Sequence, residues 1–210
     1  MALAALRLLA TAFELIAPER CAGCGSYGRQ LCESCLRSIA SKRPVERFAG
    51  LRILALGEYD GILRRAVHAL KYRNHPGIGC ALGELLARRV LASTCRPEVV
   101  IPVPLHAARQ RARGYNQAEV IARSFGNLHE PNALARIRAT SVQARLDRPG
   151  REQNVARAFA PGPRADRIYG NSVVLVDDVV TTGATMRACA AILKSAGAAA
   201  VSAAAVAIRL

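Results

Sequence analysis

Two adjacent aspartates, Asp177 and Asp178, stand near the end of an apolar stretch and just before a run of small hydroxyl residues. The stretch is VVLVDDVVTTGAT, residues 173–185, and the residues after it have helical spacing. A helix N-terminus attracts anions, because its N–H groups and its dipole favour negative charge. Carboxylates beside it would repel the same anion. The pattern therefore predicts a ligand with two chemically different ends, one of which is a phosphate.

Two other uses of acids at a strand end fit this chain poorly. A Walker B strand works with a G-x-x-x-x-G-K-[ST] loop, and the sequence contains no such loop, which argues against an ATPase. Phosphoacceptor domains also carry acids at a strand end, but T-T-G-A-T does not fit their pattern.

Four cysteines near the start form a second chemical group, spaced as C-x2-C-x7-C-x2-C. Each C-x2-C pair brings two sulfurs within reach of one tetrahedral metal, and the glycines at 23 and 25 permit the tight turns. The predicted metal ligands are Cys21, Cys24, Cys32 and Cys35. With all four positions filled by thiolates the zinc is predicted to be structural, and it stabilises a segment too small to fold on its core alone. Two disulfides or a thioredoxin-type redox pair are the alternatives, but nothing marks the chain as exported and no strand precedes the cysteines.

The composition bounds the class of protein and its partners. Hydrophobic residues make up 51% of the 210 residues, enough for a sizeable core and too many for a disordered chain. The formal net charge is +15, almost all of it from arginine, which predicts affinity for polyanions such as nucleic acid or a multiply charged small molecule.

The N-terminal residues 1–20 are apolar but carry Arg7 and Glu14. They lack a basic leading region and are too short and too charged to span a bilayer, so we expect no membrane span. Their apolar residues recur at helical spacing, which predicts an amphipathic helix, with a secretory signal as the alternative. The predicted localisation is cytoplasmic.

From residue 51 onward, strands and helices alternate. Strands are predicted at 51–59, 99–105, 133–139, 173–179 and 198–210, and helices at 61–73, 78–92, 116–126 and 184–197. The strand at 99–105 contains Pro102 and Pro104 and should end near Pro102. This order predicts an α/β fold with a parallel sheet and helices on both sides, in which ligands bind at the carboxyl ends of the strands. We divide the chain into an N-terminal helix and zinc-knuckle segment, 1–48, and a second domain, 49–210. The remaining cysteines, Cys80, Cys95 and Cys189, are interpreted as small buried residues.

The stretch at 173–185 resembles the phosphoribosyl-diphosphate (PRPP) signature of type I phosphoribosyltransferases: four apolar residues, two acids, two apolar residues and T-T-G-A-T. The paired cysteine motifs, PVPLHAARQRARGYNQ at 102–117 and RATSVQARLDRPGREQNVARAF at 138–159 together resemble the ComF-type competence protein family. The resemblance covers nearly the whole chain and implies a type I phosphoribosyltransferase-like parallel sheet.

PRPP has the two ends that the signature requires. The loop residues Thr181, Thr182, Gly183, Ala184 and Thr185 would bind its 5′-phosphate through N–H groups and hydroxyls. Asp177 and Asp178 are the predicted catalytic residues: they would bind the ribose hydroxyls, support Mg²⁺ with the pyrophosphate, and stabilise positive charge at C1.

The family pattern further implies a pyrophosphate loop after the strand at 99–105. The loop residues are Val103, Pro104, Leu105 and His106, whose backbone N–H groups would bind the pyrophosphate, with Arg109, Arg111 and Arg113 nearby as cations. The segment 138–159 would be the mobile loop over the site, with Arg138, Arg151 and Asn154 as candidates for substrate contact. The arginines of 136–167 would alternatively form a plain solvated face.

Three functions are open at this point. The first is an enzyme that transfers a ribosyl group from PRPP to a nucleophile. The second is a non-catalytic binding module, in which the PRPP site is a sensor or a relic and the basic surface binds single-stranded DNA. The third is a regulator of nucleotide metabolism that uses PRPP as an effector. The ComF resemblance implies a part in DNA uptake during natural transformation, with other DNA-uptake proteins as candidate partners. Tyr and Phe are dispersed along the sequence, so no platform for stacking single-stranded bases is expected.

Overall fold

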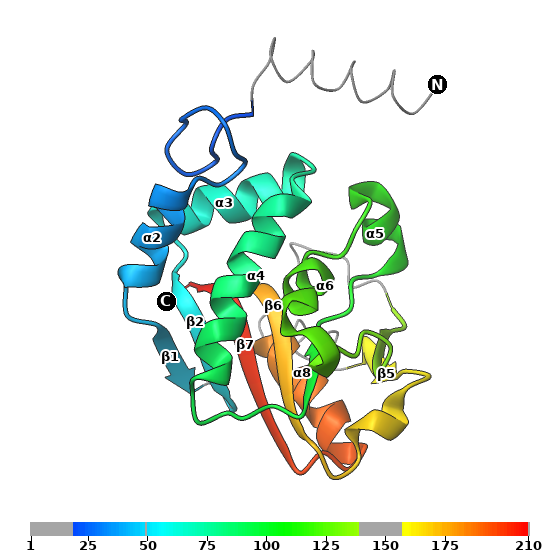
Figure 1. Cartoon of the computed structure of the whole chain (residues 1–210). Helices are drawn as coiled ribbons and strands as arrows, with labels where there is room; N and C mark the ends of the chain where they lie inside the picture. Colours follow the sequence, from blue (N-terminus) through cyan, green and yellow to red (C-terminus); the bar gives the residue numbers. More distant parts are fainter. Residues whose placement is uncertain (1–18, 49, 139–156, 210) are drawn as a thin grey trace, which may run out of the picture.

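The computed structural model describes residues 19–48, 50–138 and 157–209. Its centre is a five-stranded sheet in the order β1-β2-β7-β6-β3 (Figure 1). The strands are β1 (Val45–Phe48), β2 (Arg52–Glu58), β3 (Val99–Pro102), β6 (Ser172–Val180) and β7 (Ala200–Ile208). Four of them run parallel, and β1 adds an antiparallel edge next to β2. The predicted α/β fold with a mainly parallel sheet is confirmed.

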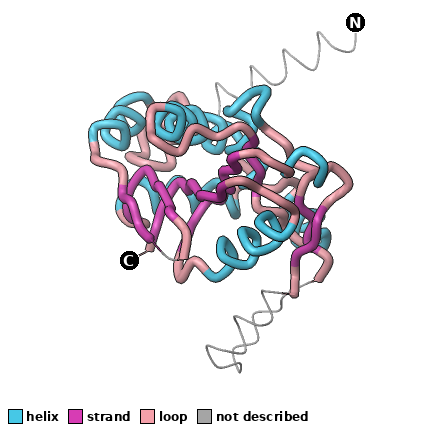
Figure 2. The backbone as a smooth tube through the Cα atoms, turned by 90° about the horizontal axis from the view of Figure 1, so that it is seen from below, coloured by secondary structure: helices cyan, strands magenta, loops and turns pink. Residues whose placement is uncertain are grey.

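Helices cover both faces of this sheet (Figure 2). The helices are α2 (Glu33–Ser41), α3 (Gly61–Tyr72), α4 (Pro76–Leu91), α5 (Ala107–Arg113), α6 (Gln117–Ala122) and α8 (Ala184–Ser195). Successive strand residues alternate between two cores, as the pleat of a strand requires: Val174 packs with α3 and α4, and Leu175 packs with α8. Short elements complete the fold: β4 (Leu134–Arg136) paired with β5 (Phe159–Pro161), and the 3-10 helices η1 (Arg123–Leu128) and η2 (Ala165–Ile168).

The longer predicted elements correspond to observed ones, and the differences have local causes. The strand predicted at 99–105 ends at Pro102, on an edge strand of the sheet where a proline is tolerated. The helix predicted for 116–126 stops at Ala122 and continues as η1, in which Gly126 adopts a φ of 59°. The helix predicted within 1–20 lies mostly outside the described residues.

Strand β7 is central in the sheet and consists largely of alanine. Ala203, Ala204, Ala205 and Ala207 are almost completely buried between β2 and β6. Asp177 of β6 pairs in register with Ala205, so the nearest strand places only a methyl group beside this acid.

The cysteine segment packs on the same core as the sheet. Cys35 and Ile39 belong to the core cluster that includes α3 and α4. Arg89 of α4 donates hydrogen bonds to the carbonyls at the end of α2, including that of Ala40 at 2.7 Å. Strand β1, at the end of the segment 1–48, joins the five-stranded sheet. The division at residue 48 stays a prediction.

The three cysteines outside the motif differ in burial. Cys189 is buried as predicted, whereas Cys80 is exposed on α4 and Cys95 is half-buried, so the prediction is wrong for Cys80. In the described part of the chain, no helix is long and apolar enough to cross a bilayer.

Candidate functional site

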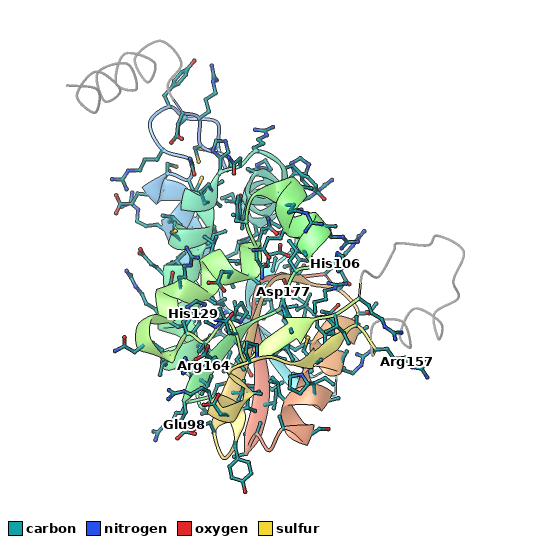
Figure 3. The ribbon with its side chains drawn as sticks, turned by 90° about the vertical axis from the view of Figure 1, so that its right-hand side faces the viewer. Glu98, His106, His129, Arg157, Arg164 and Asp177 are labelled. Carbon is teal, nitrogen blue, oxygen red and sulfur yellow. The ribbon has the colours of Figure 1, made fainter. Side chains whose placement is uncertain are left out.

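The two aspartates lie near the C-terminal end of β6, at the carboxyl edge of the parallel sheet. Asp178 is 6% exposed, and Asp177 is half-buried. The backbone N–H of Asp178 donates to Oδ1 of Asp177 at 2.8 Å. The neighbouring strand β3 ends at the same edge, because Pro102 pairs in register with Val176. Figure 3 shows Asp177 in the interior of the molecule, with His106 labelled nearby.

A lysine from another element neutralises part of this acidic pair. Nζ of Lys71, at the C-terminal end of α3, lies 2.7 Å from Oδ1 of Asp178. The two side chains are 20% and 8% exposed, so water screens this ion pair less than one on the surface. The pair fixes the carboxylate and links α3 to the end of β6.

The other aspartate has an unusual proton affinity. Burial and then the charge of Asp178 raise the pKa of Asp177 to about 7, against the smaller opposing effects of Lys71, the Asp178 N–H and Arg136. A carboxyl with a pKa near neutrality can accept and return a proton at physiological pH.

The hydroxyl loop follows β6 directly and leads into α8. Gly183 is the N-cap of α8 with a φ of 77°, a left-handed conformation that glycine adopts without strain. The N–H of Ala184 donates to Oγ1 of Thr182 at 3.3 Å, and Arg187 donates to the Thr182 carbonyl at 2.9 Å. Residues Thr181–Thr185 line a hollow of about 50 Å³ together with Asp177. The predicted phosphate loop is therefore placed beside the predicted catalytic acid.

The loop after β3 faces the acids from the other side. The N–H of Val103 continues the ladder to the Val176 carbonyl at 2.8 Å, and the Val103 carbonyl accepts from Nδ2 of Asn116 at 3.0 Å. His106 is the N-cap of α5, where its Nδ1 accepts from the N–H of Ala108 at 3.2 Å. This loop is thus fixed at both ends, by the strand and by the helix caps.

These parts enclose a cleft of about 210 Å³, the acid cleft. Its wall includes both aspartates and the cations Lys71, Arg109, Arg113 and Arg136. Of the predicted residues, it brings together Asp177, Asp178, Val103, Pro104, Leu105, Arg113 and Thr185, while Thr181, Thr182, Gly183 and Ala184 line the adjoining hollow. Arg111 and Arg138 are exposed, and neither they nor His106 line the cleft or the hollow. Arg151 and Asn154 lie outside the described residues.

The sequence analysis missed several residues of the cleft. Lys71 is 106 positions from Asp177 in the sequence. The only feature that sets it apart there is that the chain has just three lysines. Gln117 is 2% exposed and accepts from Nη1 of Arg113 at 2.9 Å, which orients that guanidinium. Arg136 lies 5.2 Å over the ring of Phe159, and its burial lowers its pKa. At least one arginine of 136–167 is therefore part of a site and not a solvated face.

The four cysteines of the N-terminal motif also come together, as the cysteine knuckle (residues 21–35). All four Sγ atoms lie within 4.8 Å of one another, with Cys21–Cys35 at 3.8 Å and Cys24–Cys32 at 3.6 Å. Tetrahedral ligation with Zn–S bonds of about 2.3 Å places sulfurs about 3.8 Å apart, so the donor set fits zinc. The sulfurs are too far apart for a disulfide, and all four cysteines are free.

The backbone of the knuckle is shaped for thiolates. The N–H groups of Gly23 and Cys32 both donate to Sγ of Cys21 at 3.3 Å. A Cβ on residue 23 would lie 2.6 Å from Sγ of Cys35, so only glycine fits there. The hydroxyl of Ser34 is the main cause that lowers the pKa of Cys32 to about 5, which favours the ligating form.

The chain is similar to known proteins over most of its length. The model of the phosphoribosyl transferase domain family matches residues 71–209. Competence protein F of Haemophilus influenzae is 32% identical over 189 residues, which cover 84% of this chain and 79% of that protein. The DNA utilization protein YhgH of Salmonella typhimurium and that of Escherichia coli K12 are each 31% identical over 191 residues, which cover 86% of this chain and 80% of the relative.

Two solved structures match part of this chain. One is described as the allosteric regulatory enzyme of purine biosynthesis, with a TM-score of 0.39 and 25% identity. The other is the glutamine PRPP amidotransferase of B. subtilis complexed with ADP and GMP, with a TM-score of 0.40 and 26% identity. Each match covers 61% of this chain and 26% of the other chain.

Proposed function

Because this chain belongs to the phosphoribosyl transferase domain family, we propose that it binds PRPP with Mg²⁺ in the acid cleft and transfers the phosphoribosyl group to a nucleophile. The observation that carries this proposal is the meeting of three parts in one place. The acid pair, the hydroxyl loop and the loop at 103–106 come from different elements and face one another at the carboxyl edge of the sheet.

The 5′-phosphate belongs in the hollow at Thr181–Thr185. The start of α8 supplies N–H groups and a favourable dipole there, and the threonine hydroxyls add donors. Gly183 keeps this turn free of a side chain, so a phosphate can approach the backbone.

The ribose lies between this loop and the acids. Asp177 lines both the hollow and the cleft, so a sugar that joins a phosphate in the hollow to a group in the cleft passes beside it. Carboxylate oxygens accept hydrogen bonds from ribose hydroxyls, and Lys71 holds Asp178 in place for this.

The pyrophosphate belongs on the opposite side of the cleft. Arg109, Arg113 and Arg136 provide cationic donors, and Gln117 orients Arg113. Two carboxylates beside a phosphate site are the donor set that Mg²⁺ uses in nucleotide enzymes. Bound there with PRPP, Mg²⁺ would neutralise charge on the leaving pyrophosphate.

In the transfer, the bond between C1 and the pyrophosphate oxygen breaks, and its electron pair leaves with the pyrophosphate. The nucleophile forms the new bond to C1 and loses its proton. The carboxylates stabilise positive charge at C1 in between. In this proposal Asp177, with a pKa of about 7, accepts the nucleophile's proton.

The test is calorimetry with PRPP, with and without Mg²⁺, followed by a pyrophosphate-release assay with a panel of bases and amines. Binding with release supports the transferase. Binding without release from any acceptor supports the alternative, a non-catalytic PRPP sensor. Absence of binding contradicts both.

A second role concerns DNA. The relatives that cover most of this chain are named a competence protein and DNA utilization proteins, and the chain carries a formal charge of +15. We infer that this protein also takes part in the handling of DNA, with single-stranded DNA and other DNA-uptake proteins as partners. Zinc bound in the cysteine knuckle would have a structural role, because four thiolates leave no open coordination position for a substrate. Arg145, Arg148 and Arg151, which the charge pattern marks as candidates for DNA contact, lie outside the described residues.

A further inference from the structure

A second cleft lies between the cysteine knuckle and the outer face of α3, away from the acid cleft. Its volume is about 890 Å³, larger than that of the acid cleft. Figure 1 shows the knuckle loop next to α3. The charged side chains that line this basic cleft are Arg20, Arg64, Arg65, His68 and Arg73, and no carboxylate of a described residue is among the lining residues.

These cations are accessible and largely uncommitted. Arg64, His68 and Arg73 are exposed and form no ion pair with a described residue. Arg65 has a structural task, since its Nε donates to the Gly23 carbonyl at 2.8 Å and fastens the knuckle to α3. The zinc tetrathiolate, with a net charge of about −2, offsets two of these positive charges, and the rest attract an anion from outside.

Two exposed aromatic rings flank the cations. Tyr27 is 61% exposed and lies 4.2 Å from the guanidinium of Arg20, measured to the ring centroid. Tyr72 is 65% exposed, and its ring centroid lies 4.8 Å from that of His68. Neither ring is part of the cleft lining, but each contacts a residue that is, Tyr27 through Arg20 and Tyr72 through His68.

Basic grooves flanked by exposed aromatic rings are the arrangement that binds single strands, because phosphates pair with the cations and unpaired bases stack on the rings. The bases of a duplex are already stacked and cannot use the tyrosines in this way. A purely ionic partner, such as an acidic peptide, would use the arginines and leave the rings idle.

We propose that the basic cleft binds single-stranded DNA, with phosphates on Arg64 and Arg73 and bases stacked on Tyr27 and Tyr72. The proposal gives the DNA role a location on the knuckle and α3 instead of the arginine-rich segment 136–167. Its charge component does not depend on PRPP binding, since Arg64 and Arg73 do not line the acid cleft, whereas the ring of Tyr72 lies 5.5 Å from the guanidinium of Arg113 in that cleft.

The test uses the full-length zinc-loaded protein and a fluorescent 20-nucleotide dT strand, with anisotropy measured across a series of salt concentrations. For the double variant Arg64→Gln/Arg73→Gln, the slope of log affinity against log salt should fall by about 1.4, at about 0.7 per phosphate on a single strand. The control Arg88→Gln/Arg167→Gln removes the same charge from exposed positions that do not line the basic cleft, and its slope should stay near that of the wild type.

A second variant, Tyr72→Ala, removes a ring without changing charge. The expected loss of affinity for dT is about 5- to 100-fold, with an unchanged salt slope. Equal loss of slope in the two arginine variants would overturn the location, as would equal affinities of wild type and Tyr72→Ala. Equal binding of duplex DNA or polyglutamate would overturn the choice of a single strand. Zinc content and the thermal melt of every variant, and PRPP titration of the arginine variants, show that the fold is intact, so a failure here is distinct from a failure of PRPP binding.

Discussion

The cysteine knuckle and the acid cleft both gather groups of like charge, but they offset the repulsion by different means. In the knuckle, four thiols converge on one point, and only a cation from solution can hold four thiolates together there. In the acid cleft, the fold supplies its own cation, Lys71, at 2.7 Å from Asp178. We therefore expect the knuckle to depend on a bound metal for stability, whereas the acid cleft is assembled by the packing of α3 against the sheet.

The largest effect is expected when the cysteine knuckle loses a metal ligand. Cys24→Ser removes one of four ligands, and structural zinc can contribute on the order of 10 kcal/mol to folding. We expect loss of the one zinc per chain and protease sensitivity in residues 19–41, with PRPP affinity close to that of the wild type. Metal analysis, limited proteolysis and calorimetry measure the three quantities.

Cys80→Ser is the matched control, because Cys80 is exposed on α4 and lies outside the motif. It should keep both its zinc and its resistance to protease. Substoichiometric zinc in the wild type, with unfolding indifferent to a chelator, would contradict the dependence of the knuckle on metal.

The next effect is on the acid cleft. Asp178→Asn removes a charged acceptor and the partner of Lys71, a loss of about 1.5–3 kcal/mol in binding, or roughly 10- to 100-fold in PRPP affinity. Zinc content should not change. Asp166→Asn is the control, since Asp166 is exposed on η2. Equal calorimetric affinities of the wild type and Asp178→Asn would place the ligand elsewhere.

A smaller effect concerns the pH dependence of stability. The raised pKa of Asp177, about 7, means that the fold is favoured while this carboxyl is protonated. Relative to a neutral side chain, that stability is fully present below the unfolded pKa of about 4 and is lost as pH rises through about 7. Asp177→Asn should therefore melt higher than the wild type at pH 8, by about 2–4 °C per kcal/mol, and less so at pH 5. The melts are run without Mg²⁺ and PRPP, and a constant difference between the two curves from pH 5 to pH 8 would contradict the shift.

The smallest effect separates the two ends of the ligand. Thr182→Val removes the hydroxyl that accepts from Ala184, and with it a donor for the 5′-phosphate. We expect a roughly 3- to 10-fold loss of affinity for ribose 5-phosphate, and little change for pyrophosphate alone. A loss confined to pyrophosphate would reverse the proposed orientation of PRPP.

The sequence was sufficient where the signal is local. The apolar run before Asp177, the loop Thr181–Thr185 and the two C-x2-C pairs each lie within a short segment, so spacing alone predicts their elements and their chemistry. Strand β1 was missed because its four residues, VERF, have too little hydrophobic pattern, and α5 was missed because a seven-residue helix is stabilised by caps such as His106 more than by an apolar face.

Contacts between segments that are far apart in the sequence could not be predicted from it. Lys71 meets Asp178 only because α3 crosses the edge of the sheet at which β6 ends. Tyr27 and Tyr72 are 45 positions apart in the sequence, yet the docking of the knuckle on α3 brings both into contact with residues that line one cleft. Side-chain spacing carries no information about such contacts, because they depend on tertiary packing.

The alanine strand β7 has a consequence for how this protein can change over evolutionary time. Ala203, Ala204, Ala205 and Ala207 have almost no side-chain volume to lose, so truncation, the usual way in which a core is damaged, hardly applies to the centre of this sheet. Any added methyl group must instead push against both neighbouring strands or the helices above them. The tolerance of this strand to mutation is therefore one-sided, and natural drift in the core is expected to proceed through the large residues of β2 and β6 while the centre remains small.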